Sequence, residues 1–231
     1  MARPATRLAM LALLAVGLVA AAVAAFGQKD PAPDLGTGLA AVADTKAMLR
    51  GIPQQGNALG DPDAPVALVE FADLQCPFCM QYHRDVLPAL LERYVRTGEV
   101  RLVLQPLQFI GPDSTELAET AAAAAAHGRL WHVAGLAFAN QGAENGGWAT
   151  SEFLDDLARA AGLDGRRLQQ ARYAGAGRGI LERAEAEAAR NHIEGTPSFL
   201  VARRGEKLEH LQPADLTLAA FTAALDELTR R

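Results

Sequence analysis

VEFADLQCPFC, residues 69–79, is the stretch of this 231-residue chain that decides its fold. Residues 66–71, VALVEF, form a near-continuous apolar run, which predicts a strand buried on both faces. A helix is expected to begin at the cysteines, because proline suits the first helical turn, where its missing N–H leaves no hydrogen bond unmade. The stretch therefore predicts a buried strand leading directly into a helix that opens with Cys76 and Cys79.

The helix start gives the two cysteines different chemistry. Cys76 is expected at or near the N-cap, where unpaired backbone N–H groups and the positive end of the helix dipole face its sulfur. Both effects favour the thiolate and lower the pKa of a cysteine. Cys79 lies almost one turn further on, within reach for a disulfide but more protected. We expect a redox-active pair in which Cys76 is the nucleophile and Cys79 the resolving thiol.

Two other uses of the cysteines are weighed. A zinc site needs about four ligands, and only His83 is close in sequence, since the other four histidines are scattered. A structural disulfide that closes so small a loop restricts the unfolded chain little and stabilises poorly. Redox chemistry is the favoured interpretation, and no metal or cofactor is expected.

The sequence after the cysteines predicts a helix and a second strand. Residues 77–97 have helical spacing, with a kink expected at Pro88 and a stop at Gly98. Residues 101–107 are a strand candidate, weakened near its end by Pro106. Strand, helix and strand in this order predict a parallel pair.

From about residue 112 to 190 the character of the sequence changes to that of an all-helical insertion. Trp131, Phe138 and Trp148 in this region either line a hydrophobic substrate groove or belong to the core. Four segments favour helix and are separated by glycine-rich breaks: 121–126, 131–139, 152–161 and 180–190.

Strand character returns after the insertion. Residues 198–202 and 207–211 are expected to pair across a turn, and residues 216–228 to form an amphipathic helix with Asp215 as a possible N-cap. A short helix is also expected at residues 39–49, before the first strand.

The N-terminus carries a targeting signal. Nineteen uncharged residues, 8–26, span roughly 28 Å as a helix, close to the thickness of a bilayer core. The basic residues Arg3 and Arg7 before them predict a cytoplasmic N-terminus and an exported remainder. A cleaved signal peptide is the alternative, because residues 22–24, AVA, have the form of a cleavage site.

The remaining chain divides into two parts. Residues 27–50 are expected to be a linker rich in proline and glycine followed by the short helix, and residues 51–231 the folded domain. The formal net charge of -5 argues against a nucleic acid partner, which calls for a clustered basic face.

The quoted stretch resembles the active-site segment of the DsbA-like thiol–disulfide oxidoreductases of the thioredoxin superfamily. Residues 195–199, GTPSF, match a second family motif about 120 residues later, and the similarity covers roughly residues 51–228. The resemblance implies an α/β thioredoxin-like fold with an all-helical insertion, preceded here by the transmembrane or signal segment. It also implies that Pro197 is cis and faces the cysteines, so that the Thr196 backbone pairs with a substrate segment. A plain turn proline is the alternative.

Three further residues are candidates for the site. Glu70 sits in an apolar run, where its pKa should rise and it could relay protons to or from Cys79; the alternative is an idle carboxylate at a strand edge. Pro77 and Phe78 are expected to contact substrate. Strongly oxidising relatives often have Pro-His at this point, and Phe78 offers Cys76 neither a hydrogen bond nor a positive charge, which leaves the direction of electron flow open.

The expected function is therefore that of a membrane-anchored extracytoplasmic enzyme that forms disulfides in exported proteins with free thiols. The resemblance further implies a quinone-linked membrane partner that reoxidises the cysteine pair. A reductase or isomerase on the same fold, and a non-catalytic export chaperone or binding module, are the alternatives.

Overall fold

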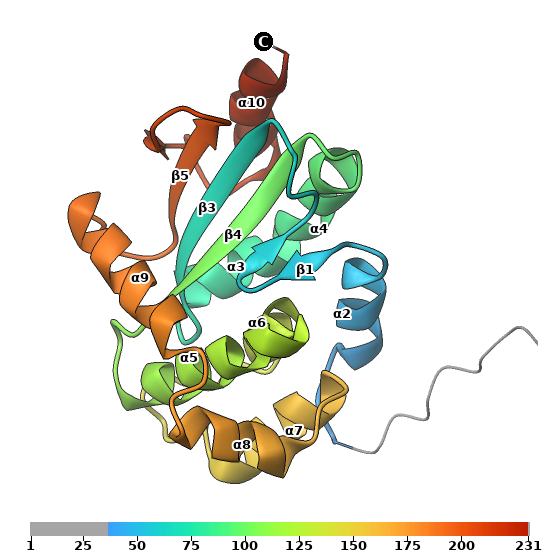
Figure 1. The fold of residues 1–231 in the computed structure, drawn as a ribbon, viewed down its shortest axis with the longest axis vertical. Helices are drawn as coiled ribbons and strands as arrows, with labels where there is room; N and C mark the ends of the chain where they lie inside the picture. Colours follow the sequence, from blue (N-terminus) through green and yellow to red (C-terminus); the bar gives the residue numbers. More distant parts are fainter. Residues whose placement is uncertain (1–36, 231) are drawn as a thin grey trace, which may run out of the picture. The chain divides into compact units, whose positions relative to one another are not determined.

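The structure, a computed structural model, describes residues 37–230. In this part of the chain a six-stranded sheet lies against helices on both faces, and an all-helical region adjoins one end of it (Figure 1). The α/β thioredoxin-like fold with a helical insertion is thus confirmed.

The sheet has the strand order β1-β2-β4-β3-β5-β6. Its centre is the parallel pair β3 (Val66–Asp73) and β4 (Val100–Leu107), as the strand–helix–strand pattern predicted. On the other side of β3, β5 (Ser198–Arg203) runs antiparallel and pairs in turn with β6 (Glu209–Leu211). The two late strands meet across a turn, as expected.

Two short strands, β1 and β2, were not predicted. Because β2 pairs with only part of β4, the other part of β4 can contain a proline. β1 (Gln54–Gln55) and β2 (Ala58–Leu59) form a hairpin, and β2 pairs with β4 only at Leu102 and Val103. Pro106 lies beyond this pairing and faces Ala72 of β3 on the other side. Its missing N–H therefore breaks no bond to β2, as is typical of prolines at a sheet edge.

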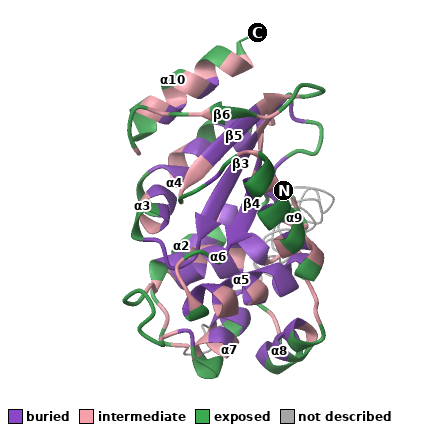
Figure 2. Cartoon of the chain, turned by 90° about the vertical axis from the view of Figure 1, so that its left-hand side faces the viewer, coloured by how far each residue is buried: buried purple, intermediate pink, exposed green. Residues whose placement is uncertain are grey.

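The two faces of the sheet are buried against different helices. Along β3, side chains alternate between the faces, and both faces are covered, so the strand is buried almost throughout (Figure 2). One face packs on α9 (Arg178–Arg190) through Ala184 and Ala188. The other packs on the helices that follow the cysteines and on α10 (Leu218–Thr229). This burial explains the continuous apolar run in the sequence.

The helix predicted over residues 77–97 is divided into three parts: α3 (Pro77–Asp85), α4 (Leu87–Leu90) and η1, a π-helical segment (Leu91–Val95). The break confirms the expected kink. Pro88 has no N–H to donate to the carbonyl of Arg84 and its ring crowds that turn, so the first helix ends before it. The residues spaced four apart are all buried: Tyr82, Val86, Leu90 and Tyr94.

The insertion contains one α-helix more than the four predicted, and also a short 3-10 helix. The helix that was not predicted is α8, whose sequence GRRLQQARY is mostly polar. Its inward face includes Arg172, which is buried and paired with Glu116 and Glu119. Trp131 is a core residue, which contradicts the groove hypothesis for it. Phe138 is buried but also lines a mainly apolar cavity together with Met80 and His83, and Trp148 is partly buried and packs on the core. The helices are α5 (Pro112–Ala124), the short η2 (Ala125–His127), α6 (Leu130–Ala139), α7 (Ser151–Ala160), α8 (Gly165–Tyr173) and α9.

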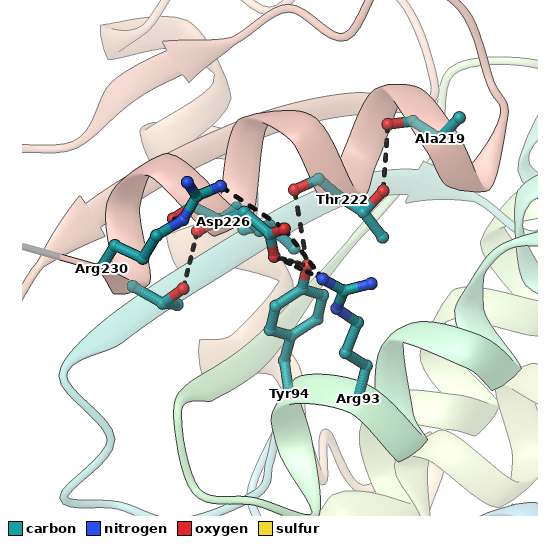
Figure 3. Close-up of polar contacts among 8 residues, drawn as sticks. Arg93, Tyr94, Ala219, Thr222, Asp226 and Arg230 are labelled. Carbon is teal, nitrogen blue, oxygen red and sulfur yellow. Dashed lines mark hydrogen bonds and ion pairs between the residues drawn. The ribbon is translucent and has the colours of Figure 1, made fainter.

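The C-terminal helix begins two residues later than expected. Thr217, not Asp215, is its N-cap, and its hydroxyl accepts a hydrogen bond from Ala220 N at 3.3 Å. The expected capping role of Asp215 is wrong, because its carboxylate accepts from the N–H and hydroxyl of Thr217 instead. Figure 3 shows how α10 is attached to η1: Asp226 accepts from the Tyr94 hydroxyl and from Arg93 Nη2, the latter at 2.8 Å.

The first described helix is α2 (Val42–Leu49), shorter than the predicted 39–49 and buried at Val42 and Leu49. Within residues 37–230, no helix combines the length and apolar character needed to cross a bilayer. The predicted anchor or signal segment, residues 8–26, lies outside the described residues.

Candidate active site

The two cysteines lie at the junction between the end of β3 and the start of α3. Cys76 is the N-cap of α3, with extended backbone angles, and Pro77 occupies the first helical turn. The Sγ atom of Cys76 accepts a hydrogen bond from Cys79 N at 3.4 Å. Both thiols are free and buried, while Phe78 between them is 60% exposed. The predicted strand-to-helix placement of the pair is confirmed.

The second motif lies directly against the first. The Thr196–Pro197 peptide bond is cis, as the family resemblance implied. The Sγ atom of Cys76 lies 3.2 Å from the carbonyl oxygen of Thr196 and, as a thiol, donates to it. Behind the proline, Ser198 Oγ donates to the carbonyl of Gly195 at 2.7 Å and closes the loop. The alternative of an unrelated turn proline does not fit this contact.

The surroundings separate the two thiols in acidity. The pKa of Cys76 is lowered to about 6, mainly by the hydrogen bond with the Cys79 side chain. Smaller contributions come from the Thr196 side chain and from the backbone N–H groups of Cys79 and Phe78, while burial opposes the shift. Burial raises the pKa of Cys79 strongly, and the contact with Cys76 and the charge of Glu70 add to the rise. Near neutral pH, Cys76 is therefore the thiolate of the pair.

Glu70 lies on the face of β3 that packs against α3, near enough to Cys79 for its charge to raise the pKa of that thiol. Its side chain is buried, and both carboxylate oxygens are hydrogen-bonded to Nε2 of His83, at 3.0 and 3.1 Å. The carboxylate is therefore not exposed, and its strand is not at the edge of the sheet. In the sequence His83 was weighed only as a zinc ligand. Its position one helical turn after Cys79 was the signal that it shares the inward face of α3.

Asp73, at the end of β3, is a structural residue that the sequence reasoning missed. Its buried carboxylate accepts four hydrogen bonds. One oxygen accepts from Gln75 N and Ser114 Oγ, at 2.8 and 2.7 Å, and the other from Phe109 N and Ile110 N, at 2.8 and 3.0 Å. The carboxylate therefore ties the loop before Cys76 to the loop after β4.

The loop between α6 and α7 holds the same segment from the insertion side. Gln141 Nε2 donates to the carbonyls of Leu74 and Cys76, at 3.0 and 3.2 Å. Asn145 N donates to the Gln75 side chain at 2.6 Å. The insertion thus contributes polar contacts that position the backbone of the cysteine loop. Across residues 37–230, the structure places no three His, Cys, Asp or Glu side chains together as ligands for a metal ion.

A cysteine pair opening a helix, a cis-proline loop against it and an inserted helical region define a DsbA-like protein of the thioredoxin class. A family profile described as thioredoxin matches residues 54–227, and the chain belongs to this family. The resemblance drawn from the sequence is confirmed.

Relatives with similar sequences carry two kinds of name. A probable disulfide bond formation protein D of Bacillus cereus is 47% identical over 57 residues, 25% of this chain and 26% of that protein. Disulfide bond formation protein D of Bacillus subtilis is 30% identical over 104 residues, 44% and 47% of the two chains. The Na(+)/H(+) antiporter NhaA 3 of Salinispora tropica is 35% identical over 184 residues, 74% of this chain and 26% of that protein. The chain thus spans a quarter to a half of the length of these relatives.

Solved structures match over a larger share. Oxidised BdbD from Bacillus subtilis has a TM-score of 0.65 at 21% identity, over 78% of this chain and 98% of that chain. DsbA from Chlamydia trachomatis has a TM-score of 0.64 at 21% identity, over 75% and 91%. At this level of identity the likeness establishes the shared fold.

Proposed function

We propose that this chain is an extracytoplasmic thiol–disulfide oxidoreductase that forms disulfides in exported proteins with free thiols. The observation that carries the proposal is the position of Cys76, whose sulfur caps a helix and lies 3.2 Å from the Thr196 carbonyl beside Pro197. The helix N-terminus stabilises a thiolate, and the loop beside it offers a place for a substrate segment.

The reaction begins with the oxidised Cys76–Cys79 pair. A substrate thiolate attacks Sγ of Cys76, the bond between the two cysteine sulfurs breaks, and Cys79 leaves with the electron pair and takes up a proton. A second substrate thiolate then attacks the substrate sulfur of this mixed disulfide, and Cys76 leaves as a thiolate. The substrate loses two electrons and gains a disulfide, and the enzyme becomes the dithiol. The low pKa of Cys76 makes it the better leaving group.

Substrate binding is assigned to the rim around Cys76. Thr196 offers backbone groups for strand-like pairing, and the exposed ring of Phe78, next to Pro77, offers apolar contact. Pro197 also lines a cavity of about 310 Å³, formed with Phe199, Leu211 and Leu216 at the β6 side of the sheet. Ser198, His210, Gln212 and Asp215 line it as well, so the cavity offers both polar and apolar contacts to a substrate segment held at Pro197.

The lowered pKa of Cys76 stabilises the thiolate and hence the dithiol form, as a disulfide donor requires. Its pKa of about 6 falls between values of about 7 for thioredoxin, a reductant, and about 3.5 for DsbA, a strong oxidant. A less acidic thiolate stabilises the reduced form less, so we expect a potential between roughly −270 and −120 mV. A value near the lower limit, with the dithiol as the form found in cells, favours the reductase or isomerase alternative.

The proposed function also requires export of the domain and reoxidation of the Cys76–Cys79 pair. The apolar residues 8–26, with Arg3 and Arg7 before them, support export by an uncleaved anchor, or by a cleaved signal peptide. Outside the cytoplasm, disulfides persist. We assign reoxidation of the dithiol to a quinone-linked membrane partner, as the resemblance to the DsbA-like family implies.

The decisive experiment is trapping. The Cys79→Ala variant retains the Cys76 nucleophile but lacks the thiol that resolves the mixed disulfide, so it should accumulate adducts with exported proteins. Its matched control is the same variant with Cys76→Ser added. Adducts in the first that vanish on reduction and are absent from the second support the proposal. Equal amounts in both contradict it, and a Cys76→Ser strain without a defect would favour the chaperone or binding-module alternative.

A further inference from the structure

A second cavity borders α3 and includes none of the residues assigned to the substrate rim. It has a volume of about 570 Å³ and is bounded by α2, α3 and α6. The helix α6 packs on both α2 and α3 and lies next to α2 in Figure 1. Such a volume can hold several waters, since each occupies about 30 Å³ of the liquid. Its lining is mainly apolar, with His83 among the polar members; the lining residues include Thr45, Met48, Met80, His83, Pro88 and Phe138.

His83 connects this cavity with the cysteines. Its ring packs against Phe138 at 4.2 Å between centroids and against Tyr82 at 5.6 Å, so its orientation is held on two sides. Nε2 faces the Glu70 carboxylate. Nδ1 is buried and has no hydrogen-bond partner among the described residues. An unpaired buried nitrogen costs free energy. Nδ1 is itself shielded from solvent, so a water from the cavity that His83 lines reaches this nitrogen when the lining side chains shift.

We propose, on the basis of the function proposed above, that His83 passes protons between Glu70 and water in the α2–α3–α6 cavity, and so supplies and removes the proton of Cys79. The two ring nitrogens of histidine allow one to take up a proton while the other releases one. His83 therefore acts through Glu70 and does not itself contact the reacting sulfurs.

The proton steps balance in both directions. When Cys79 leaves as a thiolate, it takes a proton from Glu70, Glu70 takes one from Nε2 of His83, and Nδ1 takes one from cavity water. When the dithiol is reoxidised, Cys79 gives its proton to Glu70, Glu70 gives one to Nε2, and Nδ1 releases one to the cavity. Since burial opposes a free thiolate at Cys79, either step is slow without such a route.

The charged groups around His83 are few. Glu70 faces it from β3, and Cys79 and Tyr82 share the inward side of α3 with it. Asp44 of α2 and Arg84 of α3 line the same cavity. The helix α6 presents Trp131 and Phe138, which do not titrate.

The test uses the full chain and measures two rates. The first is the rate at which Cys76 of the reduced protein reacts with iodoacetamide, which reports the nucleophile alone. The second is the rate at which Cys79 resolves a mixed disulfide between Cys76 and glutathione, followed by stopped flow between pH 5 and 9. Three variants are compared: His83→Ala, His83→Gln, which keeps a donor towards Glu70 but cannot relay a proton, and the matched control His132→Gln on α6.

The expected result is an unchanged first rate and a second rate at least tenfold slower at pH 7 in both His83 variants, with wild-type behaviour of His132→Gln. Imidazole in the buffer should restore part of the second rate in His83→Ala, because the vacated ring site opens on the cavity. If His83→Ala is unfolded by circular dichroism, His83→Gln decides. Wild-type resolution in His83→Gln overturns the role of His83 alone. A wild-type protein whose Cys76 forms no mixed disulfide overturns the proposed function as well.

Discussion

The Sγ atom of Cys76 lies 3.2 Å from the carbonyl oxygen of Thr196, a residue 120 positions further along the chain. The contact joins the helix that opens with the cysteine pair to the loop that leads into β5. Because the helix N-terminus and the Thr196 side chain both meet the same sulfur, the acidity of Cys76 depends on both segments. The contact also places the reacting sulfur beside backbone groups that can hold a substrate.

The reactivity of Cys76 should titrate near pH 6. In the reduced protein, the rate of alkylation by iodoacetamide should be constant above pH 7 and fall about tenfold per unit below pH 6, because only the thiolate reacts. Cys79 should remain unmodified until the protein is denatured. Cys76→Ser should lack the fast phase, and a midpoint near 8.5, that of an ordinary thiol, would contradict the assignment.

The same pKa makes the stability of the reduced form depend on pH. The pKa of Cys76 is lower in the folded than in the unfolded chain, so ionisation stabilises the folded dithiol above the unfolded value. This contribution should be lost as the pH falls through about 6. Urea unfolding of the reduced protein at pH 8 and pH 5, compared with reduced Cys76→Ser, measures it. Identical pH responses of the two proteins would speak against an acidic Cys76.

Thr196→Val should weaken the acidity of Cys76. The substitution keeps the shape of the side chain and removes the hydroxyl, one of the groups that lower the pKa of that cysteine. The alkylation midpoint should move upwards, by less than about one unit, since the Cys79 contacts remain. Thr222→Val, whose hydroxyl donates to the Ala219 carbonyl on α10, is the control and should leave the midpoint in place. An unchanged midpoint in Thr196→Val would show that the Thr196 hydroxyl does not lower the pKa of Cys76.

Asp73→Asn should destabilise the fold. The amide offers one acceptor oxygen in place of two, so two of the four donors around Asp73 lose their partner. We expect a loss of about 2 to 4 kcal/mol in the free energy of unfolding. Asp63→Asn, which removes an exposed ion pair with Arg204, should cost less than about 1 kcal/mol. If urea denaturation gave similar losses in the free energy of unfolding for the two variants, Asp73 would not stabilise the fold in the way described.

Tyr94→Phe should loosen α10. The hydroxyl donates to Asp226 and is the main cause of the lowered pKa of that carboxylate, while burial and Asp226 raise the pKa of Tyr94 to about 12. Loss of the bond should cost about 1 kcal/mol near neutral pH. Because the Asp226 contribution is lost as the pH falls through its lowered pKa, the difference from wild type should shrink in acid. Tyr173→Phe, on an exposed ring, is the control; an equal effect there would contradict the prediction.

Phe78→His should make the cysteine pair more oxidising. A histidine next to Cys76 adds a donor and a partial positive charge, which stabilise the thiolate and hence the dithiol. We expect the potential to rise by about 30 mV or more, which is a tenfold change in the equilibrium with glutathione. Phe109→His, at another exposed phenylalanine, should leave the potential unchanged. A fall in potential in Phe78→His would contradict the account of acidity.

Much of the fold was predictable where the cause is local. The apolar run of β3, the proline that opens α3 and the proline that breaks the following helix act through neighbours a few residues away. The helix α8 was missed because its inward side includes Arg172, whose charge is matched by glutamates of α5, more than 50 residues earlier. Without knowledge of those partners, its polar sequence predicts a solvent-exposed segment.

The candidate site shows the same division. From the sequence alone came the cysteine pair at a helix start, the proline motif, and a carboxylate in a buried strand, because each is marked by a pattern within about ten residues. The tertiary structure alone decided that Glu70 pairs with His83, that Asp73 gathers four donors, and that the Thr196 carbonyl meets Cys76. These contacts join distant segments, and packing of the sheet against its helices, which no local pattern encodes, is what brings them within hydrogen-bond distance.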